Sequence, residues 1–320
     1  MNRRQAILAV LALAAGPVHA QKVHRVGFLG AESASGYRSN VEAFRSGLRE
    51  LGLVEGKNAV IEFRWADGAY DRLPELAEQL VRMKVDVVVT HGAPGTRAAK
   101  RATTTIPIVM ASAGDASATG LVMNLARPEG NVTGSTFFAP EVGAKRLDIL
   151  KEAIPSVARV AWIFVPDNPI TPEVRRMVET AAKALKVALD QIAVRDAKEL
   201  ESVFSAIAAR RVDAVLVPEY SLFRAHAASI ASMAARQRLP TMGFTELADA
   251  GGLLGYGIDD RGMFRRAAVF VSKIIKGANP AELPVERATT FQLVVNRRVA
   301  RQLGVSITDG FMVRADRVIE

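Results

Sequence analysis

The chain has 320 residues, which is enough for two domains with sizeable cores, and it contains no cysteine. The lack of cysteine excludes disulfides, thiol catalysis, thiolate metal sites and a lipidated N-terminal cysteine. The formal net charge is +9, but the arginines are spread through the predicted helices, and no basic stretch is interleaved with aromatic residues. This distribution indicates a basic surface and argues against a nucleic-acid partner.

The first twenty residues have the pattern of a secretory signal peptide. Arg3 and Arg4 supply positive charge, residues 6–15 form an apolar run, and residues 17–20 end in small residues at the positions that a signal peptidase reads. The apolar run is too short to span a membrane. We therefore expect cleavage after Ala20 and export to the periplasm, with both the general and the twin-arginine route left open.

After this segment, strand and helix patterns alternate twice along the chain. The first series has strands at 25–30, 58–65, 85–89 and 106–110 and helices at 40–51, 73–84 and 98–102. After a short strand at 132–136 and a helix at 141–154, the second series has strands at 160–165, 187–193, 214–217, 240–244 and 251–257 and helices at 171–185, 197–209 and 224–237. Such alternation predicts parallel sheets covered by helices on both faces.

The remaining segments are too few to build a third core. They are a helix at 260–276, extended segments at 284–290 and 291–295, and a short helix at 296–303. We expect them to return to the two lobes, and several crossings between lobes make a hinge. The prediction is an α/β protein of two Rossmann-like lobes: residues 21–140 with 256–285, and residues 141–255 with 286–320.

The stretch from Val85 to Leu121 predicts a binding crevice. Two neighbouring buried strands are each followed by a loop of small residues, at 90–96 and at 111–115. In open α/β sheets, ligands bind beyond the carboxyl ends of the strands. Small residues there allow backbone N–H groups and a helix N-terminus to reach an anion or a carboxylate.

Motifs for catalysis and cofactor binding are missing from the sequence. No G-x-G-x-x-G follows the strand that ends at Gly30, and neither a G-x-x-x-x-G-K-[ST] loop nor a G-x-S-x-G elbow occurs. The four histidines have no paired spacing for a metal. We therefore expect no cofactor, no metal and no catalytic residue, and we keep an exported hydrolase or isomerase on the same lobes as an alternative.

Six segments carry a resemblance to a known family. They are VEAFRSGLRELG at 41–52, YDRLPELA at 70–77, ATTTIPIV at 102–109, LARPEGNVTG at 125–134, FRAH at 223–226 and FQLVVN at 291–296. The chain resembles ABC-transporter substrate-binding proteins of the periplasmic binding protein type I fold, in the branch with tryptophan- and tyrosine-binding members.

The resemblance implies how the protein works. Two lobes close over a small ligand, an amino acid or a related carboxylate, and the closed monomer docks on an ABC permease in the inner membrane. The ligand must favour the closed state, because it shifts an equilibrium only by its differential affinity. A sensor in place of the permease is left open.

The crevice is expected to be lined by the loops at the strand ends. Candidate ligand-binding residues are Glu32, Ser33, Ser35, His91, Gly92, Ala93, Thr96, Gly114, Asp115, Asp167, Asn168, Glu219, Tyr220, Phe244 and Tyr256. Backbone N–H groups and hydroxyls can hold a carboxylate, Asp115 or Glu219 can hold an ammonium, and aromatic rings can cover an apolar side chain. Structural roles are equally open: Asp115 can cap a helix, Asp167 and Asn168 can form a plain turn with Pro169, and both tyrosines can lie at the core edge.

Overall fold

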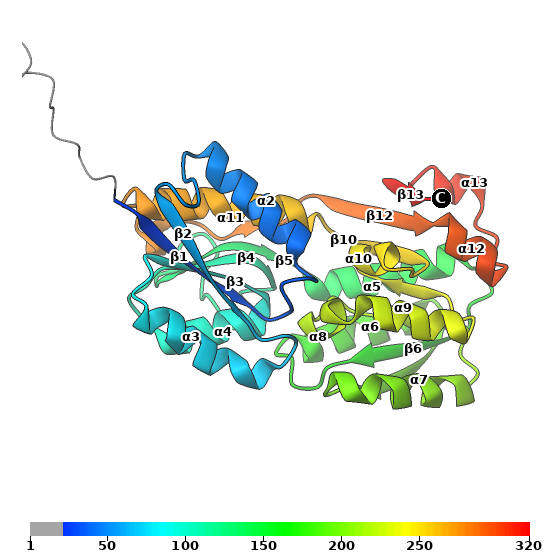
Figure 1. Ribbon diagram of the computed structural model, residues 1–320. Helices are drawn as coiled ribbons and strands as arrows, with labels where there is room; N and C mark the ends of the chain where they lie inside the picture. Colours follow the sequence, from blue (N-terminus) through cyan, green and yellow to red (C-terminus); the bar gives the residue numbers. More distant parts are fainter. Residues whose placement is uncertain (1–21) are drawn as a thin grey trace, which may run out of the picture.

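The computed structural model describes residues 22–320; the predicted signal peptide and its cleavage site lie outside these residues. Two α/β lobes lie side by side (Figure 1). The N-terminal lobe has a six-stranded sheet in the order β11-β5-β4-β3-β1-β2, and the C-terminal lobe has a seven-stranded sheet in the order β13-β12-β10-β9-β8-β6-β7. The prediction of two Rossmann-like lobes is therefore confirmed.

Helices cover both faces of the N-terminal sheet. Its elements are β1 (His24–Gly30), α2 (Arg38–Glu50), β2 (Ala59–Trp65), η2 (Tyr70–Arg72), α3 (Leu73–Arg82), β3 (Val87–His91), α4 (Gly92–Ala102), β4 (Ile108–Gly114), β5 (Val132–Phe137), α11 (Asp260–Ile275), η4 (Pro280–Glu282) and β11 (Glu286–Arg287). Along β3, Val88 packs with the core under α3 and α4, whereas Val87 and Val89 pack under α2 and α11. This strand is buried throughout because successive side chains point to opposite, covered faces.

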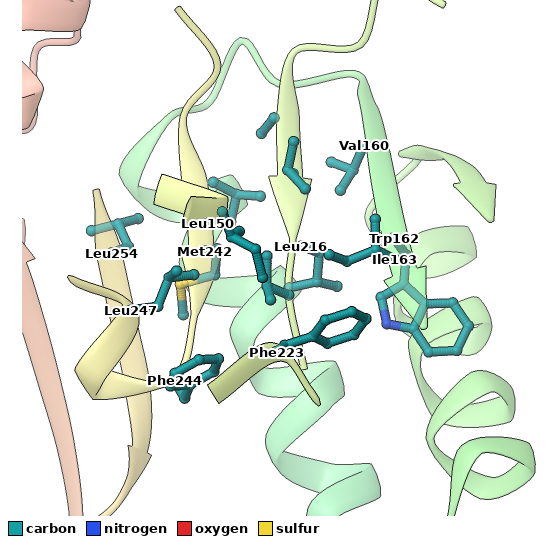
Figure 2. Close-up of a cluster of buried hydrophobic side chains, with 14 of the residues drawn as sticks. Leu150, Val160, Trp162, Ile163, Leu216, Phe223, Met242, Phe244, Leu247 and Leu254 are labelled. Atoms are coloured by element: carbon teal, nitrogen blue, oxygen red, sulfur yellow. The ribbon is translucent and has the colours of Figure 1, made fainter. Parts of the chain in front are cut away.

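The C-terminal lobe repeats this architecture around its own core. Its elements are α5 (Ala139–Ala153), β6 (Arg159–Phe164), α6 (Thr171–Ala184), β7 (Ala188–Ala193), η3 (Ala197–Glu199), α7 (Leu200–Ala209), β8 (Ala214–Leu216), α8 (Ser221–Ala225), α9 (Ala227–Arg236), β9 (Thr241–Gly243), α10 (Thr245–Asp249), β10 (Leu254–Ile258), β12 (Phe291–Asn296), α12 (Arg297–Leu303), α13 (Asp309–Met312) and β13 (Arg317–Ile319). Figure 2 shows Trp162, Phe223 and Phe244 packed together with aliphatic side chains in this core. No helix among residues 22–320 is both long and apolar enough to cross a bilayer.

Three strand-end connections join the lobes. The chain leaves the N-terminal sheet after β5 and enters α5, returns between β10 and α11, and crosses again between β11 and β12. The strand pairing corrects the predicted ranges at two points. Residues 256–258 belong to the C-terminal sheet through β10, and residues 286–287 belong to the N-terminal sheet through their pairing with β5.

Local predictions were wrong at three places that bear on the site. The predicted turn at 90–96 is the end of β3 followed directly by α4, and the predicted loop at 111–115 is mostly the end of β4. The single helix predicted at 224–237 is two helices, α8 and α9, which meet at His226. The C-terminal sheet is also mixed, because β12 runs antiparallel to β10. Small residues resemble turn formers in sequence, but here packing keeps them in regular structure.

Candidate ligand-binding site

A cavity lies between the lobes, at the carboxyl ends of strands from both sheets. Glu32 follows β1, His91 ends β3 and Gly114 ends β4 on the N-terminal side. Asn168 follows β6 and Glu219 follows β8 on the C-terminal side. The sequence-predicted residues that line this cavity are Glu32, His91, Gly92, Ala93, Gly114, Asn168, Glu219 and Tyr220. The tertiary structure thus brings together candidates from five separate segments at the position that the strand-end rule predicts.

Three of the predicted polar residues do not line the cavity, and their hydroxyl groups form hydrogen bonds within their own segments. The Oγ atoms of Ser33 and Ser35 lie 3.1 Å apart, and Ser33 Oγ accepts the Gly36 N–H. The Thr96 hydroxyl donates to the carbonyl of Gly92 one helical turn earlier in α4 (2.8 Å). These residues shape the loop after β1 and the first turn of α4 instead of facing a ligand.

Three further candidates also lie elsewhere. Phe244 is buried in the C-terminal core, as Figure 2 shows. The Tyr256 ring stacks on Phe291, with 5.9 Å between ring centroids, and only its backbone carbonyl takes part in the site. Asp167 is exposed and lines a second hollow, which is formed by residues of both lobes. Both aromatic rings therefore fill structural roles; the sequence left this role open for Tyr256, whereas the prediction for Phe244 was wrong.

Asp115 is a turn-stabilising residue in this structure. Its Oδ1 accepts the backbone N–H of Ala118 (3.0 Å), its φ is +39°, and it does not line the cavity. We expect Asp115→Ala to lower the free energy of unfolding by about 1–2 kcal/mol, because it removes the hydrogen bond and puts alanine at a positive φ. Ligand affinity should change less than about threefold. Thermal unfolding and calorimetric titration check this; a much weaker affinity with unchanged stability would contradict it.

Several cavity residues were missed by the sequence analysis. The most important are Tyr37, Ser112, Arg146, Ser221, Arg224 and Asp260. Arg146 lies inside α5, whereas Tyr37, Ser221 and Asp260 lie at helix starts. The pattern of small-residue loops covers Ser112, at 111–115, but does not point to side chains within or at the start of helices. Arg224 belongs to the FRAH segment that carried the family resemblance, and this was the one signal that pointed to it.

Arg146 and Glu219 form a buried ion pair on the C-terminal side of the cavity. Arg146 Nη2 lies 2.6 Å from Glu219 Oε2, and Arg146 Nε donates to the Tyr256 carbonyl at 2.6 Å. The two side chains are only 2% and 9% exposed. A Cβ at residue 257 would lie 3.1 Å from Arg146 Nη2, so glycine in β10 leaves room for this pair. Because Arg146 neutralises it, Glu219 does not offer the free carboxylate that the sequence analysis assigned to it.

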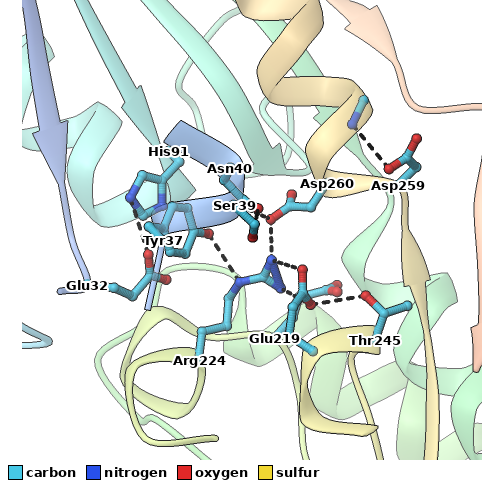
Figure 3. Close-up of polar contacts among 12 residues, drawn as sticks. Glu32, Tyr37, Ser39, Asn40, His91, Glu219, Arg224, Thr245, Asp259 and Asp260 are labelled. Carbon is cyan, nitrogen blue, oxygen red and sulfur yellow. Dashed lines mark hydrogen bonds and ion pairs between the residues drawn. The ribbon is translucent and has the colours of Figure 1, made fainter. Parts of the chain in front are cut away.

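A second ionic cluster joins the two lobes. Arg224 of α8 contacts Asp260 at the start of α11, and its Nε donates to Tyr37 Oη at 3.1 Å (Figure 3). Within its own lobe, Arg224 also pairs with Glu246 of α10 at 3.2 Å. Asn40 of α2 donates to Asp260 Oδ2 at 2.9 Å. Arg224 therefore keeps one carboxylate partner on each side of the cleft.

Tyr70 makes another contact between the lobes. It lies in η2 of the N-terminal lobe, and its hydroxyl oxygen accepts the backbone N–H of Leu222 in α8 at 3.3 Å. Burial raises the pKa of Tyr70 to about 12, so the phenol stays protonated. Together with Arg224, this contact indicates a closed arrangement of the lobes.

The N-terminal side of the cavity presents hydrogen-bond acceptors and a helix end. Glu32 and His91 are buried, with Glu32 Oε2 3.3 Å from His91 Nε2 (Figure 3). Burial lowers the pKa of His91 to about 3 and raises the pKa of Glu32 well above its usual range. Gly92 and Ala93 begin α4, whose N-terminus has no side-chain cap, so backbone N–H groups are available to a ligand carboxylate.

Comparison with known proteins establishes the family to which this chain belongs. The sequence pattern of the family described as "ABC transporter substrate binding protein" matches residues 31–319. This chain belongs to that family. A tyrosine-binding protein from Clostridioides difficile is 23% identical to this substrate-binding protein over 268 residues, which are 82% of this chain and 75% of the relative.

Solved structures share the fold of this substrate-binding protein. An ABC domain in complex with L-Trp from Streptococcus pneumoniae matches with a TM-score of 0.86 and 24% identity, covering 93% of this chain and all of the other. A ligand-free, open substrate-binding protein from Clostridium difficile covers the same 93% of this chain and 99% of its own, with 20% identity and a TM-score of 0.65. Among residues 22–320, no group of three or more histidine or acidic side chains is arranged to hold a metal ion.

Proposed function

We propose that the protein is the exported solute-binding component of an ABC importer and captures a small amino-acid-like or carboxylated ligand between its two lobes. The observation that carries the proposal is the cavity at the strand ends, which the lobes enclose together. Its walls offer the uncapped N-terminus of α4 for a carboxylate and buried acceptors at Glu32 and His91 for donor groups. The periplasm is the proposed location, and a permease in the inner membrane is the proposed receiver of a monomeric chain.

The relatives support the amino-acid class of ligand, because one is named for tyrosine and another was solved with L-Trp. The higher TM-score against the L-Trp complex than against the ligand-free, open protein supports a closed lobe arrangement. Closure by a ligand requires that the ligand contact both lobes, since only differential affinity shifts the equilibrium. Cavity residues from both sides, such as His91 and Asn168, meet that requirement.

A ligand screen by thermal shift tests the proposal. The chain without residues 1–20 is heated alone and with single amino acids, aromatic carboxylic acids, short peptides and, as a neutral class, hexoses. A ligand at about 100 times its Kd stabilises the folded state by about 2.7 kcal/mol, which is a rise of roughly 5–10 °C in Tm for lobes of this size. At least one amino acid or carboxylate should give such a rise. No rise with either class, together with turnover of any compound, would favour the exported enzyme.

A further inference from the structure

Three carboxylates line the cavity, and they differ in whether a cation neutralises them. Glu219 pairs with Arg146 at 2.6 Å, and Asp260 contacts Arg224 and accepts from Asn40. Within the described part of the chain, Glu32 has no arginine or lysine within ion-pair distance. Glu32 is therefore a buried carboxyl group in the cavity that has no cationic partner among the described residues.

The carboxyl group of Glu32 is buried without a hydrogen bond of full geometry in the described part of the chain. Its side chain is fully buried, and neither carboxyl oxygen has a hydrogen-bond partner among residues 22–320. The hydroxyls of Tyr37 and Ser221 lie nearby and offset part of the effect of burial on its pKa. The charge of Arg224 also lowers the pKa of Glu32, but the Arg224 guanidinium forms its ion pairs with Asp260 and Glu246.

His91 does not fill this gap. Its Nε2 accepts the backbone N–H of Ala31 at 3.2 Å, so the nitrogen that faces Glu32 carries a lone pair and no proton. A neutral imidazole has one donor and one acceptor nitrogen, and the acceptor is the one turned toward the carboxyl group. When Glu32 is ionised, Glu32 Oε2 and His91 Nε2 are therefore two acceptors that lie 3.3 Å apart on one buried side of the cavity.

A ligand group that suits this corner carries a positive charge and several N–H donors. A primary ammonium has three donors, and it neutralises the carboxylate that burial otherwise penalises. A site built around a buried polar group discriminates strongly against an analogue that lacks the matching group, because the protein group is then left unpaired. The uncapped N-terminus of α4, which starts right after His91, is placed to hold a carboxylate of the same ligand.

We propose that Glu32 is the residue that selects for a protonated amine, so that the site takes amino acids and rejects the same compounds without the amino group. This inference rests on the proposed function, because it assumes capture in the cavity between the lobes. It narrows the ligand from a carboxylated compound to a zwitterion. It also assigns binding of the ligand ammonium to Glu32 in the loop after β1, in place of Asp115 and Glu219, which the sequence suggested.

Matched ligand pairs test the proposal. L-tyrosine is compared with 3-(4-hydroxyphenyl)propionate, and L-tryptophan with 3-(indol-3-yl)propionate, by isothermal titration calorimetry. With the wild-type protein, at least one amino acid should bind about 100-fold or more tightly than its deaminated partner. In Glu32→Gln, which keeps the shape and loses the charge, this preference should fall below about tenfold. Glu78→Gln makes the same change on the exposed face of α3 and should keep the wild-type preference.

The outcomes separate this inference from the proposed function. A deaminated acid that binds as tightly as its amino acid overturns the role of Glu32 and leaves capture of carboxylates intact. An unchanged preference in Glu32→Gln does the same. Failure of all four compounds to bind the wild-type protein overturns aromatic amino-acid capture itself, and the selectivity with it. The wild-type comparison decides the proposal even if the Glu32→Gln protein does not fold.

Discussion

Arg224→Met is expected to leave the two lobes apart and to raise the Kd for a captured amino acid by at least about 100-fold. Arg224 lies in the C-terminal lobe, whereas its partners Asp260 and Tyr37 lie in the N-terminal lobe. In the closed arrangement Asp260 is 4% exposed. Without Arg224, closing the lobes would bury Asp260 next to no cation, and the protein avoids this by staying open.

The size of the effect follows from the burial of an unpaired charge. Removing one partner of a buried ion pair costs about 3–5 kcal/mol. Each 1.4 kcal/mol is a factor of ten in Kd, so this cost corresponds to a loss of roughly 100-fold to a few thousand-fold. Glu246 adds little, because its side chain is 36% exposed and water can solvate it. Because the cost arises only on closure, the lobes themselves should remain folded.

Small-angle X-ray scattering and calorimetry check this prediction together. The ligand-free variant should have a larger radius of gyration than the wild-type protein, a change that the loss of a direct ligand contact would not produce. Arg236→Met is the control, since Arg236 forms an exposed pair with Glu201. A compact Arg224→Met protein with an affinity within threefold of the wild type would refute the inter-lobe role.

Arg146→Met is expected to lower the Tm of the ligand-free protein by at least about 6 °C. Like Arg224, Arg146 neutralises a buried carboxylate, but Glu219 lies in the same lobe. Opening the cleft does not separate this pair, so the cost of about 3–5 kcal/mol falls on folding of the C-terminal lobe. At roughly 2–4 °C per kcal/mol, the loss appears directly in thermal unfolding.

A double variant provides the control for this second prediction. Arg146→Met combined with Glu219→Leu removes both charges, and apolar replacements of a buried pair are often neutral or stabilising. Its Tm should therefore lie above that of Arg146→Met alone. Equal Tm values for the single and double variants would show that the lost hydrogen bond to the Tyr256 carbonyl, and not the unpaired Glu219, causes the effect.

The strand-end rule located the cavity from sequence because it depends on local patterns. Buried strands such as β3 read as runs of β-branched residues, and parallel strands end at one edge of the sheet. Residues at those ends, such as His91 and Gly114, and in the loops that follow them, such as Asn168, therefore line the cavity. Their chain neighbours Asp115 and Asp167 do not line it, because one residue is enough to turn a side chain away.

The sequence by itself determined the two-lobe fold, the family and the edge of the sheets at which the cavity lies, because periodicity and motif spacing are set by neighbours along the chain. Only the tertiary structure decided which charges are neutralised. Arg146 meets Glu219 and Arg224 meets Asp260 across 73 and 36 residues, and Glu32 meets no arginine or lysine among residues 22–320. Such pairing depends on where packing brings side chains from distant segments together, and no local pattern encodes it.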